Sequence, residues 1–216
     1  MTASVTIDGV LQQAARRGVD LSTLVVGREP DHVPATPSHR WIVFPSSTGG
    51  TVVGGADRGR FAPYAEFTDP AGAADALAQL SSPPPPRPLD RPRSQVLGAT
   101  AAIGQDWAAG LQQRAWLPGT EVPVGTPLDH IGNESGHYLY LYATPMSQRS
   151  LPPTDLEERR TGYLVAAPLP PDAVVEQLPA WFGQPGGGLV VRLTRVIRYY
   201  VDTGLLFRFD PASLSP

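Results

Sequence analysis

A run of four consecutive prolines, Pro83–Pro86, followed closely by Pro88 and Pro92, divides the chain. Consecutive prolines hold the backbone in an extended polyproline II conformation that cannot join the interior of a β-sheet. We therefore predict three parts: a small N-terminal α+β module over residues 1–80, a semi-rigid proline-rich linker over 81–95, and a second domain over 96–216. A second interpretation of the prolines, as a ligand for an SH3-like module, stays open.

The composition excludes several classes of structure and chemistry. Pro and Gly account for 25 and 22 of the 216 residues, so we expect no long helices. No apolar run approaches the length of about 18 residues that a membrane span needs. All 17 basic residues are Arg and there is no Cys, which excludes a Schiff-base lysine, a P-loop, a thiol nucleophile and a disulfide. The net charge of −3 is not that of a nucleic-acid binder, so we expect no such partner.

Local patterns predict short elements in both modules. In the first we expect a helix over 8–17 capped by Asp8, strands over 41–44, 51–53 and 64–67, and a helix over 70–80 capped by Asp69. In the second we expect a helix over 103–116, strands over 139–142, 163–166, 189–193 and 205–209, and a late helix over 194–201. Consecutive short strands without crossover helices indicate an α+β protein, with a C-terminal domain that is mainly antiparallel β with few helices behind a small α+β module.

Four titratable residues are interpreted without a functional role. His32 and His39 lie among prolines, and loop histidines of this kind are more often surface residues than metal ligands. Asp129 and Glu134 are interpreted as surface or turn residues. We therefore expect no metal site.

A glycine-rich block carries the most unusual local chemistry. In Trp181-Phe182-Gly183-Gln184-Pro185-Gly186-Gly187-Gly188, a polar Gln is bracketed by two aromatic residues and by Pro with three Gly. One interpretation is a turn that needs positive φ before the next strand. The other is a loop whose small residues let a ligand approach the backbone while Gln184 is presented to it. Composition alone favours the turn.

Three tyrosines alternate along one predicted strand. Tyr138, Tyr140 and Tyr142 would share one face, with Leu139 and Leu141 on the other. A packed aromatic face is the favoured interpretation, and a stacking surface for a planar heterocycle is the alternative.

Five motifs together resemble the TNT domain, the tuberculosis necrotizing toxin family of NAD glycohydrolases. They occur over residues 117–211 in the same order as in the family: Leu117-Pro118-Gly119-Thr120, Asp129-His130-Ile131-Gly132, Gly136-His137-Tyr138-Leu139, Gln148-Arg149-Ser150-Leu151-Pro152-Pro153, and the glycine-rich block. The Phe182–Gly187 part of that block is the most specific. The resemblance implies hydrolysis of the bond between nicotinamide and ribose, with NAD or NADP as substrate and no cofactor.

The resemblance also implies the candidate catalytic residues. The Gln of the family's phenylalanine-glycine-glutamine-proline motif falls on Gln184, and an active-site Tyr falls on Tyr138. An Arg falls on Arg149, whose planar fork suits a phosphate group. The family usually has Arg at the position of His130. Because a neutral imidazole carries no charge, we expect weaker phosphate attraction there and reduced, though not abolished, turnover.

The glycine-rich block supplies the candidate substrate-binding residues. Trp181 and Phe182 could form a wall of the pocket, and Gly183, Gly186 and Gly187 would let substrate approach the backbone.

Two alternatives to hydrolysis stay open, an ADP-ribosyltransferase and a catalytically impaired NAD-binding module. The resemblance further implies a cognate immunity protein as partner. The N-terminus lacks the basic and apolar regions of a secretory signal, so we expect export, if any, by a specialised secretion system.

Overall fold

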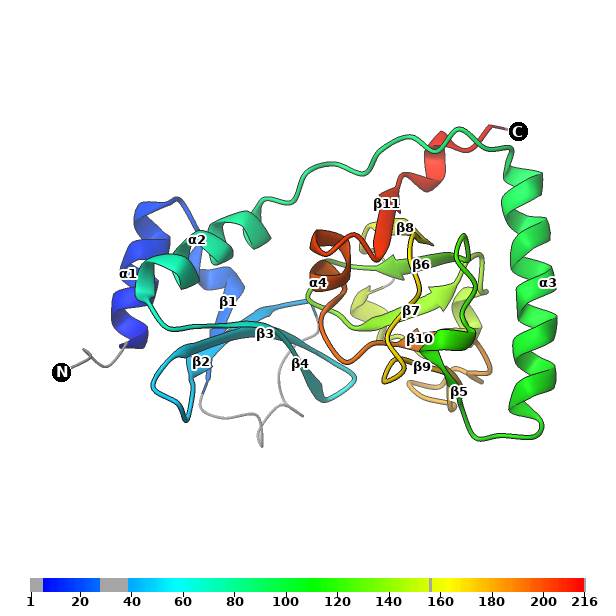
Figure 1. Cartoon of the computed structure of the whole chain (residues 1–216), viewed down its shortest axis with the longest axis horizontal. Coiled ribbons are helices and arrows are strands. Elements are labelled where there is room, and N and C mark those ends of the chain that lie inside the picture. The colour runs from blue at the N-terminus through cyan, green and yellow to red at the C-terminus, as the bar shows by residue number, and fades with distance from the viewer. Residues whose placement is uncertain (1–5, 28–38, 156, 216) are drawn as a thin grey trace. The chain divides into compact units, whose positions relative to one another are not determined.

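The computed structural model describes residues 6–27, 39–155 and 157–215, and His32 therefore lies outside the described residues. The chain divides into two compact units (Figure 1). Unit 1 comprises Met1–Pro85 with Glu134–His137, and unit 2 comprises Pro86–Asn133 with Tyr138–Pro216. The described part combines helices with a largely antiparallel unit 1 sheet and an antiparallel unit 2 sheet, which confirms the predicted α+β class.

Unit 1 is a four-stranded sheet with two helices. Its elements are α1 (Ile7–Arg16), a 3₁₀ turn η1 (Leu21–Thr23), β1 (Leu24–Val26), β2 (Trp41–Pro45), β3 (Thr51–Asp57), β4 (Arg60–Phe67) and α2 (Pro70–Ser81). The sheet order is β1-β2-β3-β4, with β1 parallel to β2 and the other pairs antiparallel. Helix α1 packs against α2 and buries Val10 and Ala14.

Of the two helix N-caps predicted in unit 1, one is confirmed and the other is wrong. Asp69 caps α2 as predicted, since its carboxylate accepts a hydrogen bond from the backbone N–H of Gly72 at 2.7 Å. The predicted cap of α1 is wrong, because Thr6 occupies the N-cap and Asp8 lies in the first turn. A negative charge there still interacts favourably with the helix dipole.

Unit 2 is built around a seven-stranded antiparallel sheet with the order β11-β8-β6-β7-β10-β9-β5. The strands are β5 (Leu117–Pro118), β6 (Pro127–Ile131), β7 (Tyr138–Leu141), β8 (Arg160–Val165), β9 (Val174–Gln177), β10 (Leu189–Arg192) and β11 (Leu206–Phe209). The helices are α3 (Arg93–Leu111) and α4 (Ile197–Asp202), and the 3₁₀ turns are η3 (Gly119–Glu121), η4 (Met146–Gln148), η5 (Pro153–Asp155) and η6 (Pro211–Ser213). Strands β5, β6 and β9 were not predicted.

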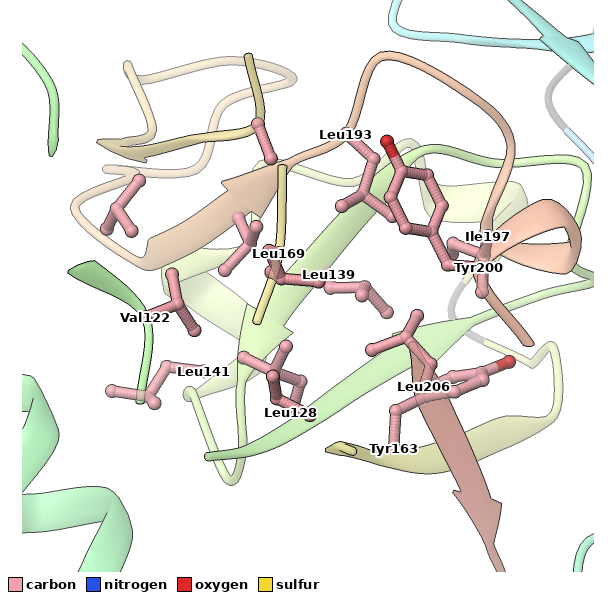
Figure 2. Packing of buried hydrophobic residues seen from close by; sticks show 14 of the residues in the cluster. Val122, Leu128, Leu139, Leu141, Tyr163, Leu169, Leu193, Ile197, Tyr200 and Leu206 are labelled. Carbon is pink, nitrogen blue, oxygen red and sulfur yellow. The ribbon is translucent and has the colours of Figure 1, made fainter. Parts of the chain in front are cut away.

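The alternation predicted for the tyrosine strand is confirmed. Leu139 and Leu141 enter the main core, which Figure 2 shows together with Leu128, Tyr163 and Leu206. The tyrosines belong to two separate clusters, Tyr138 and Tyr140 in one and Tyr142 in another. All three rings are at most 5% exposed. The sheet is therefore buried on both faces, and the tyrosine face is packed.

Helix α3 contradicts the expectation that long helices are absent. It has 19 residues and begins at Arg93, inside the predicted linker, instead of at Ile103. The reason is local, because no proline occurs between Pro92 and Pro118 and the segment is rich in Ala. The chain-wide frequency of Pro and Gly says little about a stretch from which proline is absent.

The proline-rich segment is partly integrated into unit 2. Residues Arg87 and Pro92 form parallel bridges with Phe209 and Ser215. The backbone N–H of Arg93 donates to the carbonyl of Ser215 at 2.8 Å. Prolines are tolerated here because the segment lies along an edge, where the missing N–H groups cost no internal ladder bond.

In the described ranges, no helix combines the length and the apolar character needed to cross a membrane.

Candidate active site

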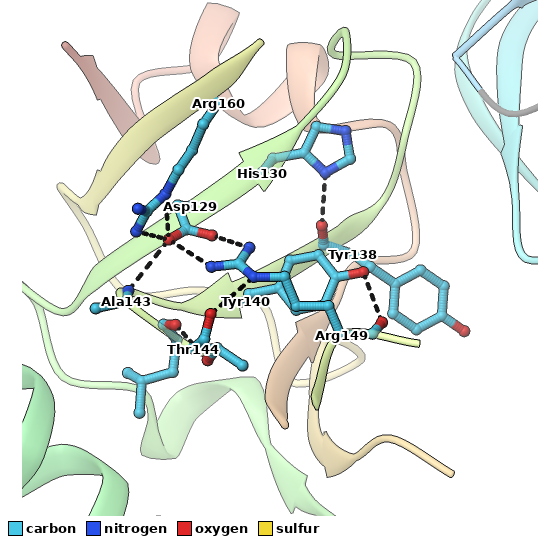
Figure 3. Close-up of polar contacts among 9 residues, drawn as sticks. Asp129, His130, Tyr138, Tyr140, Ala143, Thr144, Arg149 and Arg160 are labelled. Carbon is cyan, nitrogen blue, oxygen red and sulfur yellow. Dashed lines mark hydrogen bonds and ion pairs between the residues drawn. The ribbon is translucent and has the colours of Figure 1, made fainter. Parts of the chain in front are cut away.

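A buried ion group lies in the middle of the unit 2 sheet, on β6. Asp129 is completely buried, and its carboxylate accepts hydrogen bonds from the guanidinium groups of Arg149 and Arg160 (Figure 3). The Arg149 bond to Oδ2 measures 3.0 Å, and the Arg160 Nε bond to the same oxygen also measures 3.0 Å. The backbone N–H of Ala143 donates to Oδ2 at 3.2 Å. The interpretation of Asp129 as a surface or turn residue is therefore wrong.

Glu134, which was interpreted in the same way, lies in a turn, although it is only 8% exposed.

Arg149 is fixed on every side of its guanidinium group. Its side chain is 1% exposed, both Nη atoms bond Asp129, and Nε donates to the carbonyl of Thr144 at 2.9 Å. Its Cζ lies 4.6 Å from the ring centroid of Tyr140, whose hydroxyl donates to the carbonyl of Arg149. In this arrangement Arg149 supports the loop after β7 and directs both Nη atoms toward Asp129.

The predicted catalytic set is divided between the two faces of the sheet. Strand alternation places Asp129 and Ile131 on the face of Tyr138 and Tyr140, because Ile131 belongs to their cluster. His130 projects toward the opposite face. It is 2% exposed, and its Nδ1 lies 2.9 Å from the carbonyl oxygen of Tyr138. His130 thus contacts the backbone of Tyr138 and does not share a face with that ring.

Gln184 sits at the end of a tight turn. The backbone N–H of Gln184 donates to the carbonyl of Trp181 at 2.9 Å, and the N–H of Trp181 donates back at 3.2 Å. The two central residues, Phe182 and Gly183, have φ of 49° and 73°. Positive φ at both positions defines a type I′ hairpin turn. The interpretation of the block as a positive-φ turn is correct for this part.

Two hydrogen bonds join the glycine-rich block to the Gln148–Pro153 motif, and a third joins that motif to Pro179, just before the block. The Gly188 N–H donates to the Gln148 carbonyl at 3.0 Å, and the Ser150 hydroxyl donates to the Pro179 carbonyl at 2.7 Å. The Gln184 amide nitrogen donates to the Leu151 carbonyl at 2.9 Å. The fold therefore brings together two motifs that lie about thirty residues apart in the sequence.

The side-chain amide of Gln184 is held at one end and unpaired at the other. Because the Leu151 carbonyl can only accept, the amide must direct its NH₂ group toward it. The oxygen, Oε1, is buried and has no hydrogen-bond partner among the described residues. A buried unpaired carbonyl is unfavourable by about 1–3 kcal/mol, so this atom is prepared to accept a hydrogen bond from a bound molecule.

Two properties explain why glycine occupies these positions of the block: positive φ angles and close packing against neighbouring carbonyl groups. A Cβ on Gly186, where φ is 69°, would lie 2.5 Å from the Pro179 carbonyl oxygen. Gly187 has φ of 90°. A Cβ on Gly188 would lie 2.6 Å from the Gln148 carbonyl oxygen. The close approach of Gly188 to Gln148 holds the two motifs together, and the approach of Gly186 to Pro179 packs the block against the residues before it. The substrate contacts expected of Gly183, Gly186 and Gly187 stay predictions.

Two aromatic rings are exposed beside Gln184. Trp181 and Phe182 are 44% and 45% exposed, and their rings stack with centroids 4.4 Å apart. A positive φ is unfavourable for a bulky residue such as Phe, and backbone conformations of this kind occur preferentially at functional sites. The position is consistent with the predicted wall of a binding site.

Comparing Phe182→Gly with Phe182→Ala measures the strain in this turn. Both variants remove the ring, but only Gly adopts the positive φ without penalty. We expect the Gly variant to exceed the Ala variant in free energy of unfolding by about 1 kcal/mol. Urea unfolding of both proteins measures the difference, and equal stabilities would contradict a strained turn.

The tertiary structure thus unites some predicted site residues and separates others. Gln184 bonds Leu151, which packs in one cluster with Tyr138, and Arg149 lies two residues before Leu151. His130 lies toward the other face. Arg160 escaped the sequence analysis, because nothing in the sequence pairs it with an aspartate 31 positions earlier. The one available signal was a charged residue inside the apolar sequence of β6.

No group of three or more His, Asp or Glu side chains that could hold a metal ion occurs within the described part of the chain.

Comparison with known proteins agrees with the motifs. The family model described as tuberculosis necrotizing toxin matches residues 121–209. A solved structure, described as tuberculosis necrotizing toxin (TNT) complexed with its immunity factor IFT, is 25% identical to this chain with a TM-score of 0.38. The similarity covers 43% of this chain and 55% of that one, so the match spans about half of the toxin chain. No curated protein matches.

The family match begins at η3 and ends in β11, so it covers the strands of the unit 2 sheet from β6 to β11, the ion group at Asp129 and the Gln184 hairpin. The resemblance seen in the sequence is thereby confirmed for residues 121–209, which match the model of the tuberculosis necrotizing toxin family.

Proposed function

We propose that the toxin domain is an NAD(P) glycohydrolase, which hydrolyses the bond between nicotinamide and ribose. The observation that carries the proposal is the geometry of Gln184. Its amide is anchored to the Leu151 carbonyl, and its buried Oε1 is unpaired among the described residues, in the block that most specifically resembles the family. The substrate would be NAD or NADP, and the reaction needs no cofactor.

The chemistry requires little of the protein at the leaving group. The nicotinamide ring of NAD is cationic and departs neutral, taking the electron pair of the C1′–N1 bond. No general acid is needed, in contrast to glycosidases that protonate an alkoxide leaving group. Water then adds to C1′ and releases a proton, giving nicotinamide and ADP-ribose, or its phosphate from NADP.

The remaining requirement is to orient the reacting atoms, and we assign this role to Gln184. Its Oε1 can accept a hydrogen bond from the attacking water or from a ribose hydroxyl, and so hold the reacting atoms in line. Asp129 does not serve as the base, because both of its oxygens already accept hydrogen bonds from arginine. The exposed pair Trp181 and Phe182 are the proposed apolar contacts of the nicotinamide ring, and Tyr138 packs beside Leu151, which holds Gln184.

Incubation of the protein with NAD tests the proposal. We expect free ADP-ribose and nicotinamide in equal amounts, without any acceptor, measured by chromatography. Label transferred to protein from radioactive NAD would show a transferase instead. NAD binding without nicotinamide release at high protein concentration would show an impaired enzyme. An NAD-destroying toxin endangers the cell that makes it, and we therefore also propose a cognate immunity protein as partner.

A further inference from the structure

The ion group at Asp129 carries an excess of positive charge. One buried carboxylate faces two guanidinium groups, those of Arg149 and Arg160 (Figure 3). A buried ion pair is balanced when the charges cancel, and a second cation adds an uncompensated charge that favours a bound anion. These three groups together carry one net positive charge, which favours an anion at the partly exposed Arg160.

The two arginines differ in which guanidinium N–H groups stay available to a ligand. Arg149 is 1% exposed, and Nε and both Nη atoms are engaged with Thr144 and Asp129. The Arg160 side chain is 37% exposed, and only its Nε and Nη2 bond Asp129. Its Nη1 takes part in neither of these bonds. Arg160 is therefore the arginine that can donate to a ligand while keeping its place.

Packing holds the Arg160 guanidinium group in one orientation. Its Cζ lies 4.7 Å from the ring centroid of Tyr142, and its Nε donates to Asp129 from the adjacent strand. An arginine fixed by a carboxylate and an aromatic face loses less conformational freedom on binding than a free surface arginine. The group is thus preorganised as well as charged.

Arg160 also lies on the same face of the unit 2 sheet as Leu151, whose carbonyl holds the Gln184 amide. In β8 it alternates with Thr161, so it shares a face with Gly162, which pairs with Asp129. Asp129 connects it to Arg149, two residues before the Leu151 carbonyl that holds Gln184. His130 is directed toward the opposite face and pairs with Thr161.

We infer that Arg160 binds the pyrophosphate of NAD(P), taking the role expected of Arg149. The inference rests on the proposed function. A guanidinium N–H bonding a phosphate oxygen is a charge-assisted contact, and it contributes to binding in the ground state and the transition state alike. Loss of such a contact raises KM and leaves kcat nearly unchanged.

The test compares Arg160→Gln with Arg159→Gln in the full chain. Arg159 is exposed and adjacent, so the control removes the same charge without touching Asp129. We expect Arg160→Gln to raise KM for NAD about tenfold with kcat within about twofold of wild type, and Arg159→Gln to leave both unchanged. In Arg160→Gln, Arg149 still balances the negative charge of Asp129. Thermal unfolding measures whether this variant is folded. An unchanged KM for Arg160→Gln, or an equal rise in both variants, would overturn the inference.

A binding measurement separates this inference from the proposed function. ADP-ribose is titrated calorimetrically into wild type and into Arg160→Gln, without any turnover. Weaker binding by Arg160→Gln supports the inference even if wild type releases no nicotinamide, an outcome that would refute the glycohydrolase alone. Equal binding by the two proteins, or none by wild type, overturns the inference even if nicotinamide is released.

Discussion

Replacing Gln184 with Ala is expected to lower kcat for nicotinamide release about 100-fold, the usual effect of losing one positioned polar group in an active site. The substitution removes the buried Oε1 that is prepared to accept from water or ribose, together with the anchor to the Leu151 carbonyl. Because the turn itself is formed by backbone bonds between Trp181 and Gln184, it does not need the side chain. Steady-state release of nicotinamide measures the effect.

Gln177→Ala is the matched control. Gln177 is also an amide bound to this loop, and its Nε2 donates to the Gly187 carbonyl at 3.0 Å from an exposed position. We expect its activity to stay within about threefold of wild type, because it has no contact with the reacting atoms. Circular dichroism and unfolding curves establish that both variants are folded. Equal rates for wild type and Gln184→Ala would refute the assignment of Gln184.

Replacing Asp129 with Asn is expected to lower the free energy of unfolding by about 3–5 kcal/mol, because it leaves a buried guanidinium without its counter-charge. Arg149 is 1% exposed and cannot reach water without breaking the loop after β7. Asparagine keeps only one acceptor oxygen, so its NH₂ group must replace the other oxygen and face an N–H donor of Arg149, Arg160 or Ala143. Urea unfolding measures this loss of stability. We also expect nicotinamide release to fall, because Arg149 would no longer hold the loop whose Leu151 carbonyl binds Gln184.

Glu121→Gln provides a comparison at the surface. It breaks the pair between Arg114 and Glu121, in which the hydrogen bond from Arg114 lowers the pKa of the Glu121 carboxyl. Both side chains are exposed, so we expect little change in stability. A loss for Asp129→Asn no larger than that for Glu121→Gln would show that the buried ion group contributes nothing beyond an ordinary surface pair.

The predictable parts of the fold are those governed by local rules. Asp69 followed by Pro70 marks the start of α2, because an N-cap and a proline at the first turn act on neighbouring backbone groups. The tyrosine strand was predictable from alternation alone, since period two fixes which residues share a face. The start of α3 at Arg93 does not follow from the overall frequency of proline, because it depends on the absence of proline between Pro92 and Pro118.

The sequence by itself determined the resemblance to the TNT family, the β-rich class of the second domain and the loop that carries Gln184, since each depends on residues that are neighbours in the chain. Only the tertiary structure decided which arginine is buried and which is exposed, and on which face His130 lies. Those outcomes depend on the pairing of β6 with β7 and β8, which brings Arg160 to Asp129 across 31 positions. Strand pairing is set by the burial of whole faces, and no local pattern encodes its register.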